Sequence, residues 1–309
     1  MVVSPDVGID VGISKAKGSY LVTSSDPITG TNVRIGWHAV NVSANDIATS
    51  GIMPDLLNVV ALFPVKTKPE IIRKVMSEIN KTANGLDITV AGGHTEITQL
   101  VDRPLVIVTA IGSGNKFMTA ADAKPYDSIL MTKTAGIEGT SILAKIPKVR
   151  RLLSKDLASR GSSMINQLSI LKEARAASST GRISAMHDIT EGGVIGAVYE
   201  MSVASKLGFE LFEKDVPVDD STSAICSKLS INPLKLIGSG SLLIACPSSY
   251  GDYVSKQITR LGIACARIGR FLPSSKRRFL RRPNGECKIT QDAIQDELWE
   301  ALRKYGNLS

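Results

Sequence analysis

The sequence predicts a two-domain protein of the mixed α/β or α+β class, on three observations. Its 309 residues exceed one ordinary hydrophobic core and suit about two domains. Short β-branched runs alternate with amphipathic helical patterns, as in mixed α/β proteins. A small, polar stretch at 113–127 that contains Pro125 separates two such series. We therefore expect domains at 1–125 and 126–272, followed by a basic hairpin and a C-terminal helix at 273–309.

Composition narrows the class of protein. Hydrophobic residues make up 43% and charged residues 21% of the chain, which indicates a globular protein and excludes a disordered one. No apolar run reaches the roughly 18 residues of a membrane span, and the N-terminus lacks a charged segment that leads into an apolar one. The four cysteines show no CxxC spacing, so neither a zinc site nor a redox pair is indicated. We expect a cytoplasmic protein without membrane contact.

The formal net charge of +8 is concentrated in one segment. Residues 267–288 hold eight basic side chains and a single acid, Glu286. Basic clusters can mark nucleic-acid contact, but this one has few stacking aromatic residues, so nucleic-acid binding is not expected. A solvated pair of strands or the rim of a site for an anionic substrate fits better.

The first domain places acids in or at the ends of strand-like segments. Asp10 lies in the run DVGIDVG at 6–12, and Asp26 lies near the end of an expected strand at 19–27. Carboxylates in such positions are ordinary turn residues or metal ligands. Two of them, with further acids downstream, favour a metal site.

A helix is expected over 37–51, because Gly51 is a natural C-terminal cap and Pro54 stops the helix. Within it Asn45 and Asp46 stand among small residues, which indicates either close approach to a ligand or a solvated helix face. The next expected elements are a strand at 56–62 and an amphipathic helix at 69–83.

Residues 87–112 predict a strand, a tight glycine turn and a second strand. The glycines are Gly92 and Gly93, and the polar side chains that follow them are His94, Thr95 and Glu96. Glycines let a backbone approach a ligand closely, and a phosphate with Mg²⁺ suits such a turn. The alternative is a plain hairpin with a polar tip.

The second domain repeats a strand, a glycine turn and a helix start. A strand at 128–133 leads to a helix that opens near Gly136, and helix N-termini can bind anions. A further strand delivers His187 and Asp188 to a turn at 190–193. The stretch 234–246 is expected to hold a glycine-serine break followed by an apolar strand. The remaining expected elements are strands at 208–212 and 263–271, helices at 194–204, 250–261 and 290–304, and a hairpin around Asn284–Gly285.

Six stretches in order carry a resemblance to a known superfamily: SSDP (24–27), NVSANDIATSGIMP (41–54), VAGGHTEI (90–97), ILMTKTAGIEGT (129–140), HDITEGG (187–193) and INPLKLIGSGSLLIAC (231–246). The chain resembles the superfamily of aminoimidazole ribonucleotide (AIR) synthase, which also includes thiamine-monophosphate kinase, selenophosphate synthetase and the hydrogenase-maturation carbamoyl dehydratase. It looks most like archaeal proteins described only as related to this synthase. The motifs are specific for the superfamily and not for one member.

The resemblance implies an AIR synthase-like fold, whose N-terminal domain pairs with its twin across a β-barrel in a homodimer. It implies ATP bound with Mg²⁺ by N-terminal acids, which here are Asp10, Asp26, Asp46 and Glu96. The residues assigned to the nucleotide are Asn45, Gly92, Gly93, His94, Thr95, Lys133 and Gly136. Asp188 matches the acid near the γ-phosphate or the acceptor, and His187 beside it is a second catalytic candidate. The implied activity is ATP-dependent phosphorylation or activation of an oxygen on a small anionic substrate, of kinase or cyclo-ligase type.

Departures from the family pattern bear on turnover. The chain begins almost at the first matching strand, without the glycine-rich segment that closes over the nucleotide in family members, and lid closure excludes water. The first cysteine is Cys226 and the chain ends in Ser309, which argues against selenophosphate synthetase and carbamoyl dehydratase activity. His94 replaces an acid of some members, so metal binding is weaker. The alternative function is a nucleotide-binding scaffold or maturation-factor homologue with little turnover. The motifs do not name the acceptor.

Overall fold

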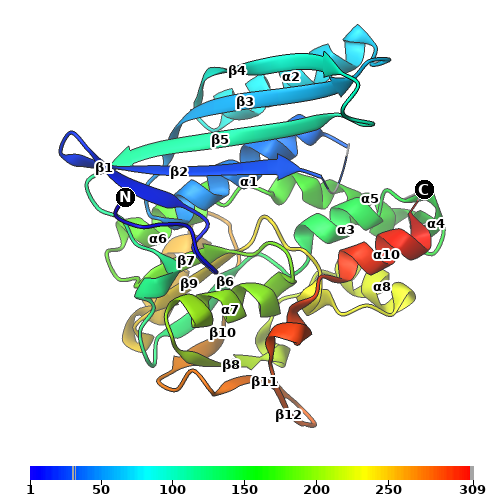
Figure 1. The fold of residues 1–309 in the computed structure, drawn as a ribbon. Coiled ribbons are helices and arrows are strands. Elements are labelled where there is room, and N and C mark those ends of the chain that lie inside the picture. Colours follow the sequence, from blue (N-terminus) through cyan, green and yellow to red (C-terminus); the bar gives the residue numbers. More distant parts are fainter. Residues whose placement is uncertain (30, 32, 307–309) are drawn as a thin grey trace. The chain divides into compact units, whose positions relative to one another are not determined.

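The computed structural model describes residues 1–29, 31 and 33–306, which form two compact units. Unit 1 comprises Met1–Pro5 and Asp10–Phe117, and unit 2 comprises Asp6–Ile9 and the chain from Met118 onward. Each unit is built on its own β-sheet (Figure 1). None of the helices that the structure describes combines the length and the apolar character that a membrane crossing requires.

Unit 1 is a five-stranded sheet in the order β1-β2-β5-β3-β4 with two helices. Its pairings are antiparallel except that of β3 with β4. Alternate residues of β5 are buried, as expected when one face of a sheet is covered, and α1 packs on β2, β5 and α2. The elements are β1 (Gly12–Ala16), β2 (Ser19–Ile28), α1 (Ile35–Thr49), β3 (Pro54–Pro64), α2 (Pro69–Gly85), β4 (Thr89–Thr98) and β5 (Leu105–Gly114).

The strand β4 shows that the predicted glycine turn after residue 91 is wrong. β4 continues through Gly92 and Gly93, and a register shift in its pairing with β3 marks a β-bulge beside them. At Gly93 φ is +148°, and a Cβ there would lie 1.9 Å from the Val59 carbonyl oxygen. This glycine is therefore required by the close pairing of the two strands.

Unit 2 contains a seven-stranded sheet in the order β12-β11-β8-β10-β6-β9-β7, in which only β11 and β8 pair in parallel. Its strands are β6 (Ser128–Thr132), β7 (Ala185–Asp188), β8 (Gly208–Phe212), β9 (Leu242–Cys246), β10 (Cys265–Leu272), β11 (Arg278–Arg282) and β12 (Gly285–Lys288). Its α-helices are α3 (Ile137–Leu143), α4 (Pro147–Arg150), α5 (Lys155–Ser163), α6 (Leu171–Ser179), α7 (Gly193–Ala204), α8 (Asp220–Leu229), α9 (Gly251–Thr259) and α10 (Glu297–Tyr305).

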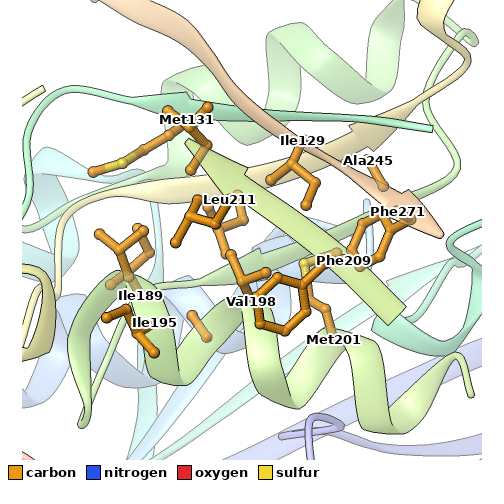
Figure 2. Packing of buried hydrophobic residues seen from close by; sticks show 14 of the residues in the cluster. Ile129, Met131, Ile189, Ile195, Val198, Met201, Phe209, Leu211, Ala245 and Phe271 are labelled. Atoms are coloured by element: carbon orange, nitrogen blue, oxygen red, sulfur yellow. The ribbon is translucent and has the colours of Figure 1, made fainter. Parts of the chain in front are cut away.

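An apolar cluster joins α7 to this sheet (Figure 2). The helix contributes Ile195, Val198 and Met201, which recur at steps of three residues and so share one face. Phe209 of β8 and Phe271 of β10 are fully buried in the same cluster. This packing holds the start of α7, and with it the turn that follows β7, in a defined place.

The C-terminal segment is not one helix over 290–304, as the periodicity predicts. It forms a 3-10 turn, η6 (Gln291–Ile294), and then α10. The break falls at Asp296, whose backbone is extended and whose side chain caps α10 by accepting the Leu298 N–H at 2.7 Å. The apolar face of α10 packs against a cluster from α3 and α8 through Leu298, Ala301 and Leu302.

The predicted class, a two-domain mixed α/β fold, is confirmed. Most predicted elements are present with shifted limits: α1 covers the expected helix at 37–51, and α7 covers the one at 194–204. The hairpin expected around Asn284–Gly285 is formed by β11 and β12. The exact domain limits of 1–125, 126–272 and 273–309 stay predictions.

Candidate functional site

Two predicted metal ligands of unit 1 converge on one hydroxyl. Ser24 and Asp26 lie on β2, and Asp46 lies on α1, which packs on that strand. The Ser24 hydroxyl donates to Asp46 Oδ2 at 2.6 Å and lies 3.3 Å from Asp26 Oδ2. The two carboxylate oxygens are therefore within about 6 Å of each other. Since a hydroxyl carries one proton, Ser24 donates fully to one carboxylate at a time.

Local structure explains why these side chains meet. Ser24 and Asp26 are two residues apart on a strand, so they project from the same face. Asp46 is 4% exposed, and the neighbouring Asn45 is fully buried. A buried carboxylate is tolerated where hydrogen bonds or a cation compensate its charge, and Ser24 supplies one such bond.

A cavity of about 440 Å³ opens beside this group. Asp10 and Asp26 line it together with Ser24, and further hydroxyls come from Thr23, Ser25 and Thr109. Hard divalent cations such as Mg²⁺ take oxygen ligands, above all carboxylates. Asp26 and Asp46, which share the Ser24 hydroxyl, offer oxygens of the kind that such an ion takes, and Asp10 lines the same cavity as Asp26.

The other predicted ligands of unit 1 lie elsewhere on the sheet. His94, Thr95 and Glu96 are on β4, which β3 and β5 separate from β2. Three interstrand steps put β4 about 14 Å from β2. His94 Nε2 lies 3.6 Å from Glu96 Oε2, and their side chains are 67% and 51% exposed. One chain therefore does not bring Glu96 to the carboxylates around Ser24.

The predicted catalytic pair of unit 2 stands at the end of β7. His187 and Asp188 are 2% and 0% exposed. His187 Nδ1 lies 2.6 Å from the Asp188 carbonyl oxygen, and its Nε2 lies 3.6 Å from Glu200 Oε2 on α7. Since a carbonyl oxygen only accepts, we assign a proton to Nδ1, which leaves Nε2 facing the Glu200 carboxylate.

A cavity of about 610 Å³ lies at the N-terminus of α7 and extends to Glu200. The turn before α7, α7 itself and the C-terminal segment contribute to its walls. Its charged lining residues are the acids Glu191, Glu200, Asp296, Glu297 and Glu300 and the bases Lys235 and Arg303. The walls of this cavity are thus rich in acids.

Two carboxyl groups near this cavity have raised pKa values. Burial raises the pKa of Asp296 to about 6, and repulsion from Glu191 and Glu138 adds to this, whereas bonds from the N–H groups of Leu298 and Gly192 oppose it. Burial also raises the pKa of Glu138, against a hydrogen bond with Ser239. Asp296, which binds the turn before α7, and Glu138 therefore retain their protons more readily than ordinary carboxyl groups.

Lys133, which is predicted to contact a nucleotide, is held by acceptors within unit 2. Its Nζ lies 2.6 Å from Glu173 Oε1 and donates to the carbonyl oxygens of Ser169 and Gly240, each at 2.7 Å. An ammonium has three N–H groups, and these partners engage all of them. Burial lowers the pKa of Lys133, while Glu173 opposes the shift. Gly136 begins α3 as its N-cap, and its contact with a nucleotide stays a prediction.

Four arginines of the basic segment 267–288 form ion pairs with acids of unit 2. It contributes to β10, β11 and β12, in agreement with the expected pair of strands. Glu210 binds both Arg270 and Arg281, and hydrogen bonds from Arg281 and then Arg270 lower the pKa of Glu210. Further ion pairs join Arg282 to Glu213 and Arg267 to Asp252. The charge of these four arginines is therefore offset within unit 2.

Sequence reasoning missed Ser24, Glu200 and Asp296. Strand periodicity could have found Ser24, because it stands two residues before Asp26. Asp296 could have been identified as an N-cap, since it directly precedes the apolar helical pattern that includes Leu298. Glu200 carries no comparable local signal, because its approach to His187 depends on how α7 packs.

The fold and these groups define a two-unit α/β protein with an acid-lined cavity in unit 1 and a strand, glycine turn and helix in unit 2. The family described as "AIR synthase related protein, N-terminal domain" matches residues 9–113, and its C-terminal counterpart matches residues 124–280. The chain belongs to the AIR synthase-related protein family, as its motifs predict.

Relatives by sequence include proteins of hydrogenase maturation. A protein of Methanocaldococcus jannaschii, named for hydrogenase expression and formation, is 27% identical over 216 residues, or 68% of this chain. The match spans about 62% of the length of that relative. Carbamoyl dehydratase HypE of Escherichia coli is 26% identical over 257 residues, which cover 80% of this chain and 74% of HypE.

Solved structures share the fold. A HypE–HypF complex matches with a TM-score of 0.77 and 20% identity, over 90% of this chain and 92% of the other. HypE in complex with ATP matches with a TM-score of 0.75 and 22% identity, over 89% and 87%. ThiL in complex with AMPPCP and TMP matches with a TM-score of 0.75 and 15% identity, over 93% and 90%.

We predict that Lys133→Met destabilises the protein, because it leaves Glu173, whose side chain is 1% exposed, as a buried carboxylate without its cation. Breaking a buried ion pair on one side typically costs about 3–5 kcal/mol, and replacing both partners by apolar residues restores much of it. Urea unfolding of Lys133→Met and of the double variant Lys133→Met/Glu173→Leu measures both effects. Wild-type stability in Lys133→Met, together with weakened nucleotide binding, would contradict the structural role.

Proposed function

We propose that this protein binds ATP with Mg²⁺ and uses it to phosphorylate or otherwise activate an oxygen of a small molecule. The observation that carries the proposal is the convergence of Asp26 and Asp46 on the Ser24 hydroxyl, beside a cavity that Asp10 also lines. The fold shared with HypE solved with ATP, and with ThiL solved with AMPPCP and TMP, supports it.

Unit 1 would hold the metal–nucleotide complex. Asp26 and Asp10 present carboxylates at the cavity, and Asp46 adds one from the buried side of β2. The Ser24 hydroxyl orients the Asp46 carboxylate, so that little reorganisation is needed when a cation binds. A bound Mg²⁺ would offset the charge of the nucleotide phosphates.

Unit 2 would handle a phosphate oxygen and a proton. The turn at 190–193 leads into α7, and the partial positive charge at a helix N-terminus favours phosphate oxygens. His187 Nε2 and the Glu200 carboxylate, 3.6 Å apart, form a pair that can take up a proton from an acceptor hydroxyl. His187 is held for this by the bond from its Nδ1 to the Asp188 carbonyl oxygen.

The residues that line the α7 cavity bear on the charge of the small-molecule acceptor. The cavity at α7 is lined by five acids and two bases, which disfavours an anionic acceptor at this position. Carboxylates of unit 2 offset the charge of four arginines in the basic segment, which weakens the expectation of an anionic acceptor beside that segment.

We also propose that the chain forms a homodimer through β4. This strand is an edge of the unit 1 sheet, and its residues are exposed on both faces up to the last one. Val90 and Ile97 are 38% and 52% exposed. An open edge with exposed apolar side chains is suited to pairing with another strand, and a second copy would complete the implied β-barrel.

We expect calorimetric titration to show saturable, Mg²⁺-dependent ATP binding that Asp46→Asn weakens at least tenfold, equivalent to about 1.4 kcal/mol. The substitution keeps an acceptor for Ser24 and removes only the charge. Asp102→Asn is the matched control, because Asp102 is an exposed acid of the same unit. Equal affinity in wild type and Asp46→Asn would refute the metal site. Binding without ADP release, in a screen of small acceptors, would favour the nucleotide-binding scaffold.

For the dimer, light scattering should give twice the chain mass for the wild type and the single-chain mass for Ile97→Glu, because the substitution places charge at the pairing edge. Leu261→Glu is the control, since Leu261 is 51% exposed in unit 2. A monomeric wild type would overturn the proposed interface.

A further inference from the structure

The C-terminal segment binds directly to the glycine turn before α7. Asp296 accepts two backbone N–H groups: Oδ2 accepts that of Gly192 at 2.8 Å, and Oδ1 accepts that of Leu298 at 2.7 Å. The first bond joins positions 104 residues apart in the chain, and the second caps α10. The Asp296 carboxylate thus links the start of α10 to the turn at 190–193.

The fit between the two segments is close. Gly192 has φ of +75°, and a Cβ at this residue would lie 2.6 Å from the Ile294 carbonyl oxygen. Any residue with a side chain would therefore be strained in conformation and would collide with the C-terminal segment. Gly192 is therefore required both for the start of α7 and for the contact with the C-terminal segment.

The contact places a carboxylate among other acids. Glu191 from the turn and Glu138 from α3 act on Asp296 and, together with burial, raise its pKa to about 6. The other charged residues that line the cavity with Asp296 are Glu200 on α7, Lys235 in a 3-10 turn at Pro233–Lys235, and Glu297, Glu300 and Arg303 on α10. Apolar packing by Leu298, Ala301 and Leu302 holds the segment from its other side. Apolar packing therefore favours the state in which the C-terminal segment is docked on the turn, whereas burial of the Asp296 carboxylate beside other acids opposes that state.

We propose that residues 291–305 form a latch, which covers the turn at 190–193 with the chain's own carboxylate and must release before a phosphate group binds there. The latch is autoinhibitory, because Asp296 occupies the N–H of Gly192 that a phosphate oxygen at this turn would use. The inference rests on the proposed function only in taking this turn as a phosphate-binding element.

The charge on Asp296 sets the direction of the pH dependence. The docked carboxyl holds its proton more tightly than an undocked aspartate, whose pKa is about 3.9. Docking is therefore strongest below that value and weakens as pH rises through the docked pKa of about 6. Between pH 5 and pH 8 the docking equilibrium should fall about tenfold.

Hydrogen exchange measured by mass spectrometry on the full chain tests the latch without ATP. In the wild type, protection of the latch amides, corrected for intrinsic exchange, should fall about tenfold from pH 5 to pH 8. Asp296→Asn lacks the titrating group, so its protection should not change over this range, and Glu297→Gln should behave as the wild type. Two results would show that the charge on Asp296 does not govern docking of the latch. One is wild-type protection that is independent of pH, and the other is the same fall in protection in Asp296→Asn.

A second series at pH 7 adds Mg²⁺ with inorganic pyrophosphate to the wild type, and Mg²⁺ alone as the control. The cation offsets the acids around the turn, so the pair is a suitable probe for a phosphate site among carboxylates. We expect Mg²⁺ with pyrophosphate to lower the protection of the latch amides severalfold, and Mg²⁺ alone to leave it unchanged. Full protection at a saturating concentration of the probe would overturn the autoinhibition. Neither series depends on the carboxylates of unit 1, so failure here is distinguishable from failure of the proposed nucleotide site.

Discussion

The contact of the Ser24 hydroxyl with the carboxylates of Asp26 and Asp46 is the interaction on which the proposed chemistry depends. It exists because α1 packs on β2 in one register, which brings a buried acid of the helix to the face of the strand that carries Ser24 and Asp26. A slip of one helical turn, about 5.4 Å, would remove it. The fold of unit 1 therefore brings two carboxylates to one hydroxyl, and carboxylates are preferred ligands of divalent cations.

Unit 2 handles its buried charges differently. Lys133 and Glu173 neutralise each other inside the unit, and arginines of the basic segment neutralise Glu210. These pairs hold elements together and leave little charge for a ligand. At the start of α7, in contrast, Asp296 lies beside other acids, and burial, with a smaller contribution from repulsion by Glu191 and Glu138, raises its pKa to about 6. Ionisable groups whose pKa is shifted by burial and by like charges are frequent at functional or switching positions.

Much of the fold follows from local pattern, and the failures have physical causes. The helix at 37–51 and the strand, turn and helix around residues 187–204 are predictable, because caps, glycines and apolar periodicity agree there. The glycine pair at 92–93 wrongly predicts a turn, because these glycines allow the close pairing of β3 and β4. A β-bulge and a turn have the same local sequence signal, so the sequence alone does not separate them. The partners of Lys133 were not predictable either, because they come from segments more than thirty residues away. Of the acids of unit 1 that are expected to act together, Asp26 and Asp46 share the Ser24 hydroxyl, whereas Glu96 lies on a strand that β3 and β5 separate from β2.

The most direct test of the account is anomalous diffraction from crystals grown with Mn²⁺ and a non-hydrolysable ATP analogue. The account predicts a Mn²⁺ peak between the carboxylates of Asp26 and Asp46, bonded to at least one oxygen of each and to the nucleotide phosphates. A structure with the nucleotide bound and no metal at these two residues would contradict it.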